Sequence, residues 1–163
     1  MFPSDFNPEL DLELIETVPL TPNQLFNGWT DSEILKIWFC PRPWRVIECT
    51  IDLRVGGLFS NIMQSPEGNV MPENKGCYLF IEKPNRLVWT GMLKENFRPN
   101  PVPQLGFGFV CDLSFEAQSN DTTRFHAIVK HSDREGKEKH EQMGFHKGWR
   151  IALAQLVDYY KKP

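Results

Sequence analysis

The chain has 163 residues, of which 40% are hydrophobic and 24% are charged, and its formal net charge is -3. This length fits one domain with a sizeable core, and the scattered basic residues give no footprint for nucleic acid, which we do not expect as a partner. No apolar run approaches the roughly 18 residues of a membrane span, and no secretory signal opens the chain. We therefore expect a cytoplasmic protein with a polar leader over residues 1–9 and a single domain over residues 10–163.

The first third of the chain predicts a strand, two short helices and a second strand. Leucines alternate with acids over residues 10–20, which is typical of a strand. Thr21 before Pro22 is typical of a helix start, and a second short helix restarts after Gly28. Over residues 44–55 the apolar positions recur with period two, which indicates a half-buried antiparallel strand.

The rest of the chain predicts further strands and then one long helix. Strands are expected at residues 58–64, 74–82, 107–116 and 120–131, with another directly after a tight turn at Pro84–Asn85. Three prolines at positions 99, 101 and 103 predict a long irregular connection. Helical spacing of apolar residues predicts one terminal helix from about Asp133 to Tyr160. This order defines an α+β arrangement in which the final helix covers one face of an antiparallel sheet.

Catalytic and metal-binding motifs are not found in the sequence. The cysteines at positions 40, 49, 77 and 111 form no CxxC pair and are expected to be buried reduced thiols. The stretch HEQMG begins like a zinc-protease motif, but Gly144 stands where the second histidine is required. No GxSxG, P-loop or GxGxxG occurs. We therefore expect no catalytic residue, no metal and no cofactor.

Three of the four histidines differ in the face that their sequence phase assigns to them. His126 falls opposite the apolar residues of its strand and is expected to point to solvent, whereas His131 shares their face. His146 precedes Trp149 by three residues and shares its helix face. We hypothesise that His131 and His146 are polar anchors of an otherwise apolar pocket. The alternative is that each is a satisfied or solvent-exposed histidine.

Four segments together resemble a known family. In order and spacing, residues 52–59, 76–90, 122–131 and 144–156 resemble landmarks of the activator of heat-shock-protein ATPase homologue family, within the START-like (SRPBCC) superfamily. The resemblance covers about residues 10–160. It implies a helix-grip fold, in which a curved antiparallel sheet of about six to seven strands wraps a long C-terminal helix and leaves an internal cavity.

The resemblance suggests why two glycines stand in the predicted terminal helix. Gly144 and Gly148 each cost about 1 kcal/mol relative to alanine in a helix interior. In a helix-grip fold they would face the cavity mouth and leave room for a guest. The alternative is that they admit tight packing of the helix on the sheet, with Trp149 filling the core.

Aromatic residues supply most of the lining that we expect for such a pocket. The stretch WFCPRPWRV places several aromatic rings at the junction between the short helices and the next strand. These rings would form either the rim of a cavity or a cap on the core. The predicted lining residues are Trp38, Phe39, Trp44, Phe59, Met63, Trp89, Phe107, His131, Met143, His146 and Trp149.

Three functions follow from the resemblance and the lining. The first is a binding protein for a hydrophobic or aromatic small molecule. The second, as the alternative to it, is an interaction module that activates a heat-shock chaperone ATPase. The third is an enzyme, as in polyketide cyclases of the superfamily, which the outward phase of most acids disfavours. Either a monomer or a homodimer is compatible with an exposed edge strand.

Overall fold

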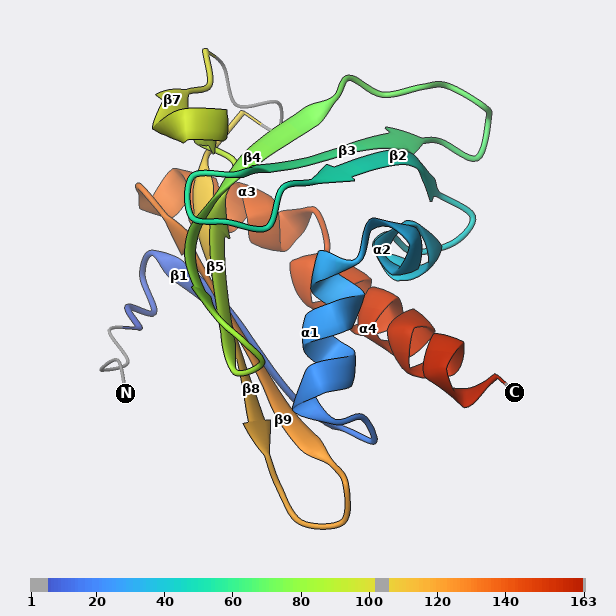
Figure 1. Cartoon of the computed structure of the whole chain (residues 1–163). Coiled ribbons are helices and arrows are strands. Elements are labelled where there is room, and N and C mark those ends of the chain that lie inside the picture. Colours follow the sequence, from blue (N-terminus) through green and yellow to red (C-terminus); the bar gives the residue numbers. More distant parts are fainter. Residues whose placement is uncertain (1–5, 102–105, 163) are drawn as a thin grey trace.

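The computed structural model describes residues 6–101 and 106–162, which form a seven-stranded antiparallel sheet with helices gathered on one face (Figure 1). The strands are β1 (Asp11–Val18), β2 (Arg45–Ile51), β3 (Leu58–Gln64), β4 (Asn74–Glu82), β5 (Arg86–Thr90), β8 (Phe109–Ala117) and β9 (Thr123–His131), with β6 (Leu93–Lys94) and β7 (Arg98–Pro99) forming a separate small ladder. The helices are α1 (Pro22–Thr30), α2 (Ser32–Trp38), α3 (Arg134–Gln142) and α4 (Phe145–Lys161), with a 3-10 turn η1 (Glu95–Phe97).

The sheet order is β1-β9-β8-β5-β4-β3-β2, so the first strand of the chain lies beside the last. Six consecutive antiparallel strands run from β2 to β9 once the β6–β7 ladder is set aside, and β1 adds the seventh. The predicted α+β class, the strand number and the two early helices are therefore confirmed. Figure 1 shows the β2–β3 end of the sheet bending over α1, α2 and α4.

The two short helices begin where their sequence signals place them. The Thr21 hydroxyl accepts a hydrogen bond from Gln24 N while the Gln24 side chain accepts one from Thr21 N, which makes a capping box at α1. Asp31 caps α2 by accepting from the backbone nitrogens of Glu33 and Ile34. Together these caps fix the sharp junction between α1 and α2.

The prediction of a single terminal helix is wrong, because the segment forms two helices, α3 and α4. Gly144 adopts a left-handed conformation with φ of 89°, which ends the first helical segment and precedes the second. A Cβ at Gly144 would meet nothing within 4 Å, and one at Gly148 would meet only Pro41 Cγ at 4.0 Å. Close packing on the sheet therefore explains neither glycine.

The strand predicted over residues 44–55 ends earlier than its pattern, at Ile51. A register shift between Val46 and Glu48 interrupts its alternation, and Leu53 is 42% exposed in the turn that follows. In that turn Asp52 and Arg54 form a surface ion pair, with 2.8 Å between carboxylate and guanidinium and both side chains half exposed.

The helix-covered face of the sheet carries the hydrophobic core. Its fully or almost fully buried members include Leu12, Leu14, Leu25, Phe26, Leu35, Leu87, Leu113, Phe115, Phe125, Ala127, Val129, Leu153 and Leu156. Each buried leucine contributes about 2 kcal/mol of transfer free energy. None of the helices described here is long and apolar enough to cross a membrane.

Candidate functional site

Eight aromatic side chains form a closed cycle between the sheet and the helices, which we call the aromatic circuit. In order its members are Trp29, Phe39, Phe59, Trp89, Phe109, His140, Phe145 and Trp149. Each ring centroid lies 4.9 to 6.0 Å from the next, and the last ring closes the cycle on the first. Such pairs contribute about 0.5–1.5 kcal/mol each beyond area burial. The circuit thus links the sheet to the helices.

Strand register places the sheet members of the circuit on one face. Trp89 pairs with Cys111 of β8, which is fully buried and lies two residues from Phe109. Trp89 also pairs directly with Tyr78 of β4, whose ring stacks on Phe59 at 5.6 Å. All five of these side chains, including Cys111 and Phe59, therefore point toward the helices.

Side-chain hydrogen bonds to main-chain groups hold the helices that carry the other circuit members. The Trp38 indole donates to the Gly28 carbonyl at 2.8 Å and fixes α2 against α1. The Gln155 amide of α4 donates to the carbonyls of Trp38 and Cys40 and accepts from Arg42 N at 3.0 Å. The buried amide therefore holds the segment that carries Phe39 against α4.

A buried histidine pair connects α3 to the start of the sheet. His131 Nδ1 lies 2.9 Å from the Leu10 carbonyl, which can only accept, so Nδ1 carries the proton. His131 Nε2 therefore accepts from His140 Nδ1, 2.9 Å away. Burial first, and the neighbouring His131 second, lower the pKa of His140 to about 4. The pKa of His131 is also lowered, chiefly by burial, so both rings are neutral at pH 7.

Three buried hydrogen-bond donors at the circuit have no partner among the described residues. They are the indole nitrogens of Trp29 and Trp89 and the hydroxyl of Tyr78, on residues that are 2%, 8% and 0% exposed. Burial raises the pKa of Tyr78, so its hydroxyl stays protonated. A buried donor without a partner costs about 1–3 kcal/mol, and neighbouring rings supply only weak N–H···π contacts.

The structure brings most of the predicted lining residues together. Phe39, Phe59, Trp89 and Trp149 belong to the circuit, and Trp38, Phe107, His131 and His146 contact its rings. The other three belong to none of these ring contacts: Trp44 is 37% exposed, Met143 is 59% exposed at the end of α3, and Met63 is half-buried on β3.

The hypothesis that His131 and His146 are polar anchors of a pocket stays a prediction. His131 is buried on the predicted face of β9 and is hydrogen-bonded to His140. His146 is half-buried and packs edge-on against Phe145. His126 lies on the opposite face of β9 from His131 and bonds to the Glu13 carboxylate at 2.8 Å.

Five residues of the site were not among the predicted lining residues: Trp29, Tyr78, Phe109, His140 and Phe145. Tyr78 and Phe109 lie on apolar strand faces, so alternation alone could have identified them. His140 lies in a strongly charged stretch, and only the break at Gly144 turns its ring toward Phe145.

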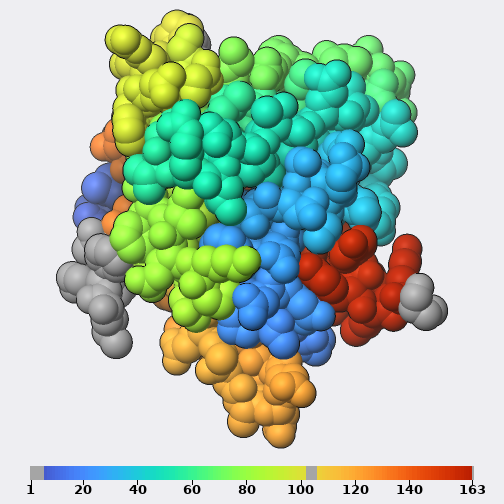
Figure 2. Space-filling model, viewed as in Figure 1, coloured from blue at the N-terminus to red at the C-terminus, as the bar shows by residue number. Residues whose placement is uncertain are grey.

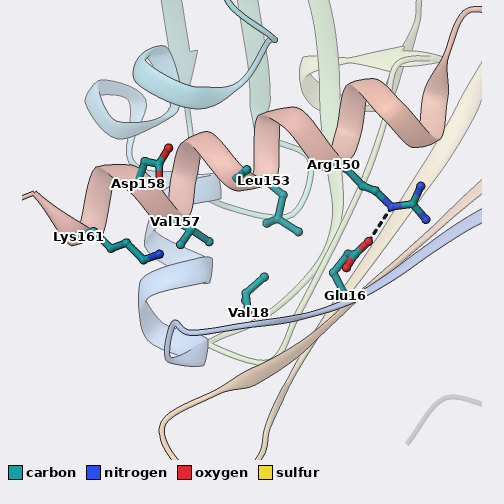
Figure 3. A pocket seen from close by; sticks show the side chains of 8 residues that line it. Glu16, Val18, Arg150, Leu153, Val157, Asp158 and Lys161 are labelled. Carbon is teal, nitrogen blue, oxygen red and sulfur yellow. Dashed lines mark hydrogen bonds and ion pairs between the residues drawn. The ribbon is translucent and has the colours of Figure 1, made fainter.

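Two surface hollows lie elsewhere. One, of about 300 Å³, lies between β1 and α4 and is lined by Glu16, Val18, Arg150, Leu153, Ala154, Val157, Asp158 and Lys161 (Figure 3). An Arg150–Glu16 ion pair of 2.7 Å lies at one end of it. The second, of about 530 Å³, is lined by Ile37, Arg42, Tyr159, Tyr160 and Lys162. Neither hollow includes a circuit residue, and the internal cavity stays a prediction.

The thiols are free, and three of the four are buried. Burial raises the pKa of Cys40 and of Cys49 to about 11, so neither is an activated nucleophile. Within residues 6–101 and 106–162, no cluster of three or more metal-ligating side chains is present.

A bent antiparallel sheet that closes on a C-terminal helix is the helix-grip architecture of START-like proteins, as the resemblance implied. The family model described as Activator of Hsp90 ATPase homolog 1-like protein matches residues 19–161, and the chain belongs to this family. The predicted family is therefore confirmed. None of the curated proteins compared with the chain matches it.

Solved structures agree with this assignment. A crystal structure of a protein from Nitrosomonas europaea is 38% identical, with a TM-score of 0.86 over 94% of this chain and 95% of that one. A solution structure from Arthrobacter aurescens is 21% identical, with a TM-score of 0.80 over 98% and 91% of the two chains. The AHSA1-like protein from Aeromonas hydrophila is 18% identical, with a TM-score of 0.64 over 91% of each chain. The last two similarities concern the fold alone.

Proposed function

We propose that the protein binds a small apolar, largely aromatic molecule at the aromatic circuit, between the sheet and α4. The observation that carries this proposal is the circuit itself, in which eight rings from both layers of the fold form one unbroken cycle. Binding sites that are rich in aromatic side chains and have few polar groups suit flat apolar ligands. A ligand of this kind would replace ring–ring contacts with ring–ligand contacts of similar energy.

Solvent access to the circuit supports the same function. Phe39, Phe109 and Trp149 are only half-buried, whereas the other five members are buried. The helix surface beside Trp149 also has room for a methyl group, because a Cβ at Gly148 would make only an ordinary van der Waals contact with Pro41 Cγ, at 4.0 Å. A guest would therefore enter from the α4 side by displacing the half-buried rings.

Two measurements test this function. Native mass spectrometry of the purified protein detects any molecule that is retained, and titration with N-phenyl-1-naphthylamine, a neutral fluorescent aromatic amine, measures binding directly. We expect saturable 1:1 binding that Trp149→Ala weakens about tenfold, because the ring–ligand contact and its buried area are lost. Trp44→Ala is the matched control, since Trp44 is 37% exposed and has no ring pair among the described residues. An unsaturable signal, or equal loss in both variants, would refute the proposal.

A second candidate function is docking onto a heat-shock chaperone. The family description names an activator of Hsp90 ATPase, and the turn after β2 exposes apolar side chains. Val55 and Phe97 are each 50% exposed, and the Phe97 ring lies against Gly56. Figure 2 shows this turn beside the β6–β7 ladder on one face of the molecule. The test is the ATPase rate of purified Hsp90, which the protein should raise and Phe97→Asp should not. An unchanged rate with the unmodified protein would exclude this function.

A further inference from the structure

We propose that the ligand of the aromatic circuit carries a neutral carbonyl-type oxygen, which accepts hydrogen bonds from Tyr78 Oη and Trp89 Nε1. This inference rests on the proposed function and names the chemical class of its ligand: flat aromatic ketones and related rings with an acceptor at one edge.

The strand register places the two residues that carry the donors side by side on one face of the sheet. Tyr78 and Trp89 are direct partners across β4 and β5, and both rings contact Phe59, with centroids 5.6 and 4.9 Å away. Directly paired residues on one sheet face have Cβ atoms about 4.5–5.5 Å apart. One carbonyl oxygen has two lone pairs, so it can accept from both donors at once.

The fold satisfies the same chemical groups elsewhere. The Trp38 indole donates to the Gly28 carbonyl at 2.8 Å, and the Tyr160 hydroxyl donates to the Gln24 carbonyl at 3.0 Å. Four buried side-chain polar atoms lack a partner in the described part of the chain: three are the donors at the circuit, and the fourth is Glu95 Oε2 in η1. The clustering of the three donors at one site supports a ligand contact there.

The charge of the site selects a neutral acceptor. An indole nitrogen can only donate, so Trp29 on the helix side and Trp89 on the sheet side both require acceptors. No lysine or arginine belongs to the circuit, and the His140 ring is neutral because burial lowers its pKa. A buried carboxylate would lack a cationic partner here, whereas a ketone carries no net charge.

Ligands of matched shape test the proposal. Fluorene has no polar group, 9-fluorenone adds one carbonyl oxygen, and carbazole adds an N–H donor instead; indane and 1-indanone repeat the comparison at a smaller size. In a site that offers no hydrogen-bond donor, a ketone binds more weakly than its hydrocarbon, because its hydrogen bonds to water are lost. In this site we expect each ketone to bind about fivefold more tightly than its hydrocarbon, and carbazole to bind no better than fluorene. Isothermal titration calorimetry measures the affinities.

Single-residue variants test whether Tyr78 and Trp89 are the donors responsible for the ketone preference. Tyr78→Phe removes only the hydroxyl and should reduce the preference for 9-fluorenone over fluorene severalfold. Tyr160→Phe is the control and should change neither affinity, because its hydroxyl donates to the Gln24 carbonyl. The ¹⁵N-indole resonance of Trp89, assigned with Trp89→Phe, should shift with 9-fluorenone more than with fluorene.

Each contrary outcome has a distinct meaning. Equal affinity for ketones and hydrocarbons, or a ketone preference that survives in Tyr78→Phe with no shift at Trp89, would overturn this inference and leave the proposed function standing. Failure of both size series to bind would overturn the inference and the proposed function together.

Discussion

Replacing Tyr78 by phenylalanine should stabilise the ligand-free protein, although removing a buried hydroxyl usually destabilises a fold. Tyr78 is fully buried and its hydroxyl has no hydrogen-bond partner among the described residues. Removing the oxygen relieves a desolvation cost of about 1–3 kcal/mol. The void of one oxygen atom costs a few tenths of a kcal/mol. The ring keeps its stacking on Phe59, at 5.6 Å and 12°. We therefore expect the free energy of unfolding to rise by about 1 kcal/mol.

Urea denaturation of the ligand-free protein, followed by circular dichroism, measures this change. Tyr160→Phe is the matched variant, because its hydroxyl donates to the Gln24 carbonyl at 3.0 Å and its loss should cost about 1 kcal/mol. The two substitutions therefore have opposite expected signs. Destabilisation by Tyr78→Phe of the same size as by Tyr160→Phe would refute the reasoning, because it would mean that the Tyr78 hydroxyl is satisfied in the ligand-free protein.

Three further predictions follow. Burial lowers the pKa of His140 from 6.5 to about 4, so the unfolded chain binds more protons between these values and stability falls as the pH drops. From pH 7 to pH 5 this costs about 2 kcal/mol, and urea titrations of His140→Gln should show a flatter pH dependence than the wild type. Gly28→Ala should destabilise by about 1–3 kcal/mol, because the new Cβ would lie 2.7 Å from Leu156 Cδ1. Gly148→Ala should instead stabilise by about 0.5–1 kcal/mol through helix propensity, because its Cβ would make only an ordinary contact with Pro41 Cγ at 4.0 Å. Equal melting shifts for the two glycine variants would contradict the geometry.

Local sequence signals were sufficient for much of the fold. Period-two patterns placed β8 and β9, while Thr21 before Pro22 and the restart after Gly28 placed the two short helices. The break between α3 and α4 was missed because the charged α3 has no apolar side chains whose spacing could reveal a change of phase at Gly144, where a left-handed backbone separates the helices. The early end of β2 at Ile51 was missed because alternation persists into an exposed turn.

The site was less predictable, because its chemistry depends on contacts between elements that are distant in sequence. The pairing of Tyr78 with Trp89 requires the β4–β5 register, which includes a shift between Tyr78 and Phe80. The His131–His140 bond requires both the end of β9 and the docking of α3. Hydrogen-bond satisfaction is likewise a property of the assembled fold, so no pattern in the sequence marks a donor without a partner.

The pairing of β1 with β9 determines when the sheet can form during synthesis of the chain. Leu12 lies opposite Val129, so β1 has no neighbour in the sheet until β9 has been synthesised. The circuit is completed later still, because His140, Phe145 and Trp149 all follow β9 in the sequence. A ligand of the proposed kind would therefore bind only after α4 has been synthesised, as a guest of the folded domain rather than as a template for nascent polypeptide.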